Sequence, residues 1–213
     1  MILHGDGCAS ANHEYLARHL ASRGFMAAIP ASTASYDHDT LLSAGLKSPQ
    51  KWLPGLAGKA AGGKGVVFCH SMGAERTLQL LSASSQVQAM VFMGPVYTTT
   101  SRYGQSLFPV QGLVIGGSED GQSGPSYYET VYEQFDSPRY TAVLQGGDHS
   151  QFTDDKHWEG TPNPAVMARN RQFELVQSLS PACLQRVYGQ AEPFAAWLTP
   201  QGVPAEVVLQ SQP

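Results

Sequence analysis

Short apolar runs rich in β-branched residues alternate along this chain with segments in which apolar residues recur at helical spacing. Glycine-rich or polar turns separate these runs and segments. Such alternation is typical of a mostly parallel sheet with helices on both faces, an α/β fold. The predicted strands are residues 2–3, 25–29, the run that ends at residue 70, 89–93, 112–116, 141–144 and a tail strand at 203–209. The predicted helices are residues 12–23, 50–61, 74–82, 127–135, 164–179 and 193–198.

Residues 65–77 combine an apolar strand, a sharp turn at Ser71 and the start of a helix. A serine at such a turn is held in a strained backbone conformation with its hydroxyl exposed, which suits a nucleophile. The positions two residues before and after it must be small, so that strand and helix can approach closely. Gly73 meets this requirement, and Cys69 replaces the first glycine with another small side chain. The pattern Cys-x-Ser-x-Gly predicts a nucleophile elbow, provided that its catalytic partners are also present.

Two further reactive side chains follow predicted strands. Asp120 comes after the strand at 112–116, and His149 after the strand at 141–144. Ligands of open α/β sheets bind beyond the carboxyl ends of the strands, so these residues and Ser71 are expected at one edge. Their order along the chain, Ser then Asp then His, is the order of triads on this type of sheet.

The chemistry assigns a role to each of the three. A serine hydroxyl is a poor nucleophile unless a neutral imidazole takes its proton, and His149 is the predicted base. Asp120 is predicted to orient that imidazole. Glu119 and Asp148 are rival carboxylates. Asp148 is the weaker rival because neighbours on an extended chain point to opposite sides.

The substrate-facing groups are predicted from their position. An oxyanion needs preorganised donors, and the amide of Met72 at the helix start is one candidate. The amide of Asp6, in the turn that begins with His4, is the second. Tyr97 and Trp158 are candidate pocket walls, with core packing as the alternative.

The other histidines and Cys69 have structural interpretations. His70 is expected to pack or hydrogen-bond beneath the site, and His4 to shape the oxyanion loop. A metal site formed by His13, His4 and Asp6 matches no closed ligand set, so no metal is predicted. Cys69 is expected to face away from the pocket and pack.

The composition narrows the function classes. A chain of 213 residues is long enough for one domain, predicted to span 1–213. A formal net charge of −4 without a Lys/Arg cluster argues against nucleic-acid binding. Three widely spaced cysteines fit neither a zinc site nor a disulfide framework. Because no membrane span or signal peptide is evident, we expect a cytoplasmic protein, or a secreted one if a leader precedes this numbering.

Five separated motifs carry a family resemblance. They are His4-Gly5-Asp6-Gly7, the segment at 15–25, Cys69-His70-Ser71-Met72-Gly73, Gly117-Ser118-Glu119-Asp120 and Gly147-Asp148-His149-Ser150-Gln151-Phe152. Together they resemble the α/β-hydrolase superfamily, and within it the dienelactone-hydrolase-like and platelet-activating-factor-acetylhydrolase-like serine esterases. Chlorophyllases and bacterial polyester hydrolases belong to the same neighbourhood.

The resemblance implies an α/β-hydrolase fold and a cofactor-free hydrolase of carboxylic esters. Members of the family commonly place one or two strands before the first strand found here, so the resemblance implies either an N-terminally shortened sheet or a lost N-terminal segment. Asp6 departs from the family, in which a neutral or aromatic residue is commoner.

We therefore expect a serine esterase that cleaves a small-molecule ester through an acyl-enzyme, as a monomer or homodimer. Thioester hydrolysis, lactone hydrolysis or a lyase step on the same triad stays open, since one fold and triad host all of them. A non-catalytic binding protein that retains the fold is the alternative from another class.

Overall fold

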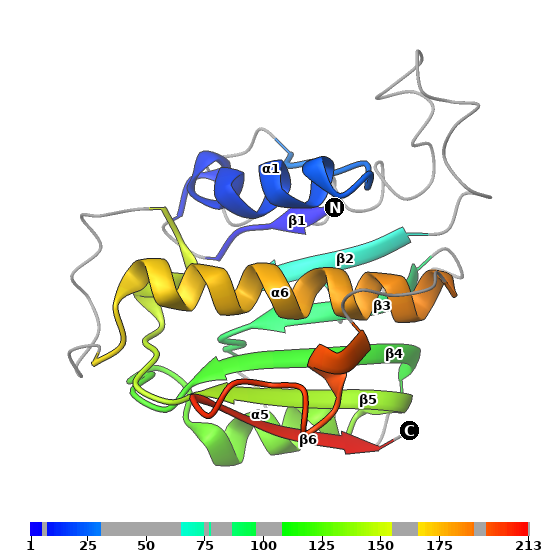
Figure 1. Ribbon diagram of the computed structural model, residues 1–213. Coiled ribbons are helices and arrows are strands. Elements are labelled where there is room, and N and C mark those ends of the chain that lie inside the picture. The colour runs from blue at the N-terminus through cyan, green and yellow to red at the C-terminus, as the bar shows by residue number, and fades with distance from the viewer. Residues whose placement is uncertain are drawn as a thin grey trace.

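The middle layer of the molecule is a six-stranded sheet, seen in the computed structural model in Figure 1. The strands lie in the order β1-β2-β3-β4-β5-β6, and every neighbouring pair is parallel except the antiparallel pair β5 and β6. The predicted mostly parallel sheet is confirmed. The structure describes residues 1–5, 8–30, 65–74, 77, 87–96, 108–154, 166–189 and 195–212. The strands are β1 (Ile2–Leu3), β2 (Gly65–His70), β3 (Val87–Met93), β4 (Phe108–Gly117), β5 (Phe135–Leu144) and β6 (Val207–Gln212).

Helices cover both faces of this sheet (Figure 1). They are α1 (Glu14–Ser22), α5 (Pro125–Tyr132), α6 (Arg169–Tyr188) and the 3₁₀ helices η1 (Ser10–His13), η4 (Ser150–Phe152) and η5 (Ala195–Leu198). Successive strand side chains point to opposite faces, so each strand feeds two separate cores. In β2, Val66 and Phe68 pack in the core that contains α1 and α6, whereas Val67 and Cys69 pack in the core that contains α5.

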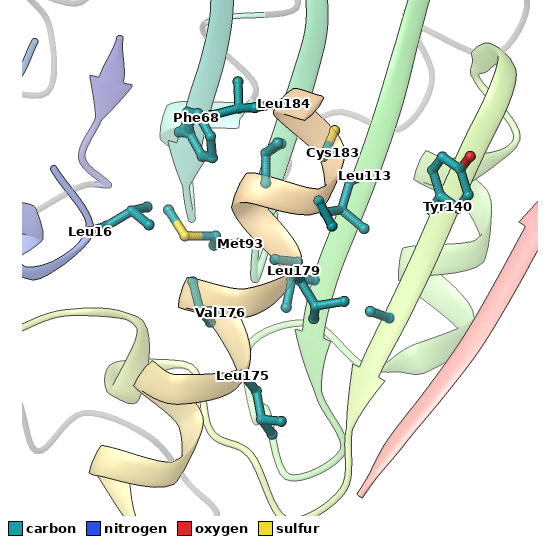
Figure 2. Packing of buried hydrophobic residues seen from close by; sticks show 14 of the residues in the cluster. Leu16, Phe68, Met93, Leu113, Tyr140, Leu175, Val176, Leu179, Cys183 and Leu184 are labelled. Atoms are coloured by element: carbon teal, nitrogen blue, oxygen red, sulfur yellow. The ribbon is translucent and has the colours of Figure 1, made fainter. Parts of the chain in front are cut away.

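The larger core lies between the sheet and helix α6, as Figure 2 shows. Leu175, Val176 and Leu179 project from one side of α6. They pack in the same fully buried cluster as Met93 of β3 and Leu113 of β4. Burial of each such leucine typically contributes about 1.5–3 kcal/mol, so α6 is firmly attached to the central strands.

Helix α6 is longer at its C-terminal end than the sequence predicts. It runs for 20 residues and continues past Pro181, where the pattern predicts an end near residue 179. Proline removes one helical hydrogen bond. Burial of Cys183 and Leu184 beyond it compensates, because both side chains pack in the core. Within the described ranges, no helix is long and apolar enough to cross a membrane.

The predicted boundary between α5 and β5 is wrong. α5 ends at Tyr132, and β5 begins at Phe135 rather than at residue 141. Asp136 and the next residues are exposed or half-buried, so the apolar pattern of the strand starts only at Tyr140. β4 likewise begins at Phe108, ahead of the predicted start at residue 112. In β5, the sequence pattern detects the buried half of the strand and misses the mostly exposed or half-buried residues that precede it.

Other predicted elements differ or lie outside the described residues. The segment 25–29 is not a strand, although its Ala28 carbonyl accepts a hydrogen bond from the Ile2 amide at 2.9 Å. The tail strand is β6 at Val207–Gln212, later than the predicted 203–209. The predicted helix at 50–61 lies outside the described residues. Of the helix predicted after the elbow, Gly73, Ala74 and Thr77 are described and helical.

Candidate active site

Ser71 directly follows β2 in a backbone conformation that few residues adopt. Its φ is +54°, which makes it the one non-glycine residue with positive φ in the described part of the chain. Such a conformation costs on the order of 1–3 kcal/mol and persists only where the surroundings impose it. The Ser71 amide donates to the Met93 carbonyl at 3.1 Å, and the Ser71 carbonyl accepts from Ala74 at 3.1 Å and Val96 at 3.2 Å. The strained turn expected at this serine is present.

A continuous chain of hydrogen bonds connects three of the predicted residues. His149 Nε2 lies 2.9 Å from Ser71 Oγ, and His149 Nδ1 lies 2.8 Å from Asp120 Oδ2. A carboxylate only accepts, so Nδ1 carries a proton and the lone pair of Nε2 faces the serine hydroxyl. All three residues are buried. The structure thus brings Ser71, His149 and Asp120 together in the order that a nucleophile, a base and an orienting carboxylate require.

Asp120 is held by donors on both carboxylate oxygens. Oδ1 accepts from the amides of Gln122 at 2.8 Å and Ser123 at 2.9 Å. Oδ2 accepts from His149 and from the Tyr128 hydroxyl, each at 2.8 Å. Burial by itself raises the pKa of Asp120, but the His149 ring and these donors outweigh burial and leave the pKa below its ordinary value. Asp120 is therefore ionised at neutral pH.

The rival carboxylates bind elsewhere. Glu119 accepts from the Ser118 hydroxyl at 3.1 Å. Asp148 Oδ1 accepts from the amide and the hydroxyl of Ser150, the first residue of the short helix η4. The choice of Asp120 over both therefore agrees with the geometry.

Helix α6 fixes the loop that carries His149. The buried side-chain amide of Gln172 accepts from the Asp148 amide at 3.0 Å and donates to the Asp148 carbonyl at 2.9 Å. Gln172 thereby satisfies both backbone groups of the residue before His149, as a strand partner would.

Two glycines allow the loop after β1 and the turn at Ser71 to approach each other closely. A Cβ added to Gly73 would lie 2.7 Å from the His4 carbonyl oxygen, so the turn after Ser71 passes directly against the end of β1. A Cβ added to Gly5 would lie 2.6 Å from Ser71 Cβ and 3.2 Å from Ser71 Oγ. The loop after β1 thus borders the serine hydroxyl, where the second oxyanion donor is expected.

The other predicted substrate-facing residues have different outcomes. Met72 is half-buried and follows Ser71 at the start of the helical turn. Asp6, Tyr97 and Trp158 lie outside the described residues, so their predicted roles stay predictions.

Two further buried histidines, His70 and His13, lie one after the other beside the His149 ring. The ring centroids of His70 and His149 are 4.9 Å apart, and those of His13 and His70 are 5.3 Å apart. His70 Nε2 donates to the His149 carbonyl at 3.3 Å. Burial first, and then the neighbouring rings, hold the pKa of His70 well below its ordinary value, so it is neutral. His4 Nδ1 donates to the Gly5 carbonyl at 2.8 Å, in line with the predicted structural roles of both residues.

Cys69 faces away from Ser71, as predicted. Its thiol packs in the core on the α5 side of the sheet, 2.9 Å from the Thr77 hydroxyl. Burial raises the pKa of this thiol to about 12. A thiolate is the reactive form of cysteine, so Cys69 has neither the position nor the ionisation of a nucleophile.

The sequence analysis missed Gly94 as a neighbour of the candidate site. Gly94 follows β3 with a φ of +49°. A Cβ there would lie 3.0 Å from both Asp120 Oδ2 and His149 Nδ1. Such contacts are tighter than most that real Cβ atoms make, so a side chain here would require Asp120 or His149 to shift by a few tenths of an ångström. In the sequence, the glycine followed by Pro95 indicates a turn and nothing more.

The comparisons with known proteins do not show a family for this chain. The sequence matches no protein-family model, and no curated protein matches it either. No group of three or more His, Cys, Asp or Glu side chains in the described ranges is arranged to hold a metal ion. The geometry of the Ser71–His149–Asp120 hydrogen-bond chain is therefore the basis for inferring a function.

Proposed function

We propose that this protein is a serine hydrolase that cleaves carboxylic esters through an acyl-enzyme. The observation that carries the proposal is the hydrogen-bond chain from Ser71 Oγ through His149 to Asp120, with distances of 2.9 and 2.8 Å. The positive φ of Ser71 supports it independently, since a strained turn that presents a serine is the mark of a nucleophile elbow.

In the first step, Ser71 Oγ attacks the carbonyl carbon of the ester while His149 Nε2 accepts the hydroxyl proton. The carbonyl oxygen becomes an oxyanion, which the Met72 amide and an amide of the loop after β1 would stabilise. Collapse of this intermediate breaks the ester bond. The alcohol leaves with the proton from His149, and the acyl group stays on Ser71.

In the second step, a water molecule attacks the acyl carbon while His149 Nε2 accepts its proton. Collapse returns that proton to Ser71 and releases the acid. Throughout, ionised Asp120 keeps His149 in the tautomer that leaves Nε2 free to accept, and it stabilises the imidazolium that forms. Neutral His70 beneath the ring adds no positive charge to oppose that imidazolium.

We further propose an α/β-hydrolase fold. Ser71 follows β2, Asp120 follows β4 and His149 follows β5, all at the carboxyl edge of the parallel part of the sheet. This chain order and strand placement are those of the triad of that fold. The two cores on opposite faces of the sheet also fit it.

The test is hydrolysis of p-nitrophenyl esters of graded acyl-chain length. The wild type is expected to release p-nitrophenol with saturation kinetics, and Ser71→Ala to lose roughly 10⁴-fold or more in kcat. Ser178→Ala on the exposed side of α6 is the matched control and is expected to keep wild-type rates. Equal rates for Ser71→Ala and the wild type would exclude the proposed nucleophile.

The same preparation separates the alternatives. Thioesters and lactones with the same acyl group compare the three hydrolytic reactions on one triad, and the proposal expects the oxygen ester to have the highest kcat/KM. A folded wild type without activity on any of them is the result expected of a binding protein.

A further inference from the structure

Tyr128 joins the hydrogen-bond chain at its far end. Its hydroxyl donates to Asp120 Oδ2 at 2.8 Å, the same oxygen that accepts from His149 Nδ1 at 2.8 Å. The other oxygen, Oδ1, is occupied by two backbone amides. Oδ2 is therefore shared between a tyrosine hydroxyl and the imidazole of the proposed base.

The fold holds the Tyr128 ring in one place. The residue lies on α5 and is fully buried. Its ring covers Gly116 of β4 so closely that a Cβ on that glycine would lie 1.9 Å from Tyr128 Cε2. The close approach of α5 to β4 at a glycine thus fixes the distance between the hydroxyl and Asp120.

Packing alone does not account for the hydroxyl. A phenylalanine would fill the same space in the α5-side core, whereas a buried hydroxyl costs free energy unless it is hydrogen-bonded. Burial, and then the Asp120 carboxylate, raise the pKa of Tyr128. The group is therefore a permanent donor to Asp120 rather than a base.

A donor on Oδ2 changes what this oxygen offers to His149. A hydrogen bond to a carboxylate stabilises its negative charge. Since part of that charge is then already compensated, the carboxylate stabilises a positive imidazolium less than it would without this donor.

On the basis of the hydrolase function proposed above, we propose that Tyr128 is a positioning residue of the triad. Its hydroxyl fixes the Asp120 carboxylate and extends the activity of the site to lower pH. It does not contact the substrate and takes no part in proton transfer.

The test is the pH profile of kcat/KM for Tyr128→Phe, which deletes only the hydroxyl. The midpoint of the acid limb is expected to move to higher pH by about half a unit, as loss of part of a charged hydrogen bond implies. Tyr132→Phe is the matched control, because Tyr132 is buried on the same helix and its ring packs beside the Arg139 guanidinium. It is expected to keep the wild-type midpoint. A purely structural tyrosine would lower the rate or the stability without moving the midpoint.

A second readout does not need activity. The proton between His149 Nδ1 and Asp120 is expected to give a low-field ¹H NMR resonance, which moves to lower field in Tyr128→Phe as the remaining hydrogen bond strengthens. Unchanged midpoint and resonance in the folded variant would overturn the inference. An inactive wild type with the expected NMR shift would overturn the hydrolase function instead. If Tyr128→Phe does not fold, Ser123→Ala removes the longer hydroxyl contact to Oδ2, at 3.4 Å, and is expected to shift both readouts the same way but less.

Discussion

Gly5 lies directly against Ser71, so that a Cβ on Gly5 would come within 2.6 Å of the Ser71 Cβ. Gly5→Ala must therefore displace either the loop after β1 or the serine. Because small misplacements of reacting groups are costly, we expect a loss of roughly 10²-fold in kcat. Gly65→Ala is the control, because Gly65 lies on β2, the strand that leads to Ser71, and its added Cβ meets no atom of the described residues within 4 Å. Steady-state kinetics of both variants check this, and equal rates would refute the close approach.

Gly94→Ala is expected to separate activity from stability. Its φ of +49° strains an alanine, and its Cβ would lie 3.0 Å from Asp120 Oδ2 and His149 Nδ1. We expect a loss of about 1–2 kcal/mol of unfolding free energy and a loss of kcat on the order of 10-fold or more. The matched variant is Gly189→Ala, with a φ of +63° but no atom of the described residues within 4 Å of the added Cβ. It should lose comparable stability and keep its activity. Similar kcat values for both variants would show that activity does not require a residue without a Cβ next to the His149–Asp120 pair.

Gln172→Leu is expected to loosen the His149 loop. The substitution keeps a similar side-chain size but leaves the buried amide and carbonyl of Asp148 without their partner. Each of the two unpaired groups costs about 1–3 kcal/mol, so urea unfolding should report a loss of about 2–6 kcal/mol, together with a lower kcat. Gln177→Leu on the same helix removes only a long hydrogen bond of 3.4 Å to the Tyr15 carbonyl and should lose far less. If Gln172→Leu is as stable and active as Gln177→Leu, Gln172 does not hold the His149 loop in place.

Because His13 is buried, we expect the free energy of unfolding to fall at acid pH. Burial, and then His4, lower the pKa of His13 to about 3, while the unfolded chain has its ordinary value of 6.5. Below pH 6.5 the unfolded state therefore binds more protons, and stability falls as the pH falls toward 3. Between pH 7.5 and 5.0 this histidine alone should cost about 2 kcal/mol. Urea unfolding at both pH values should show that the free energy of unfolding falls about 2 kcal/mol less in His13→Phe than in the wild type. If His13→Phe and the wild type lose the same stability between these pH values, His13 is not the cause of the acid sensitivity.

The sequence was sufficient for the catalytic candidates because their chemistry is local. Ser71 needs small neighbours and a strand-to-helix turn, and both are visible within a few residues. Asp120 and His149 each come at a strand end, and the parallel sheet then brings these ends to one edge. Candidate triad partners far apart in the chain could be predicted for this reason.

Residues that act through tertiary contacts could not be predicted in the same way. Tyr128 has the spacing of a core aromatic, and its hydroxyl meets Asp120 only because α5 packs closely on Gly116. Gly94 and Gln172 likewise depend on how the end of β3 and helix α6 meet the His149 loop. Strand boundaries were missed where polar, exposed residues precede the buried half of the strand, as in β5.

The proposed function requires that Ser71 is a nucleophile activated by His149. A fluorophosphonate probe tests it most directly, because the serine oxygen displaces fluoride and stays bound to phosphorus, which mass spectrometry can locate. We predict one phosphonyl group on the wild type, on the peptide that contains Ser71, no such adduct in Ser71→Ala and strongly slowed labelling in His149→Ala. A folded wild type that is not labelled, or a Ser71→Ala protein labelled as fast as the wild type, would contradict the claim.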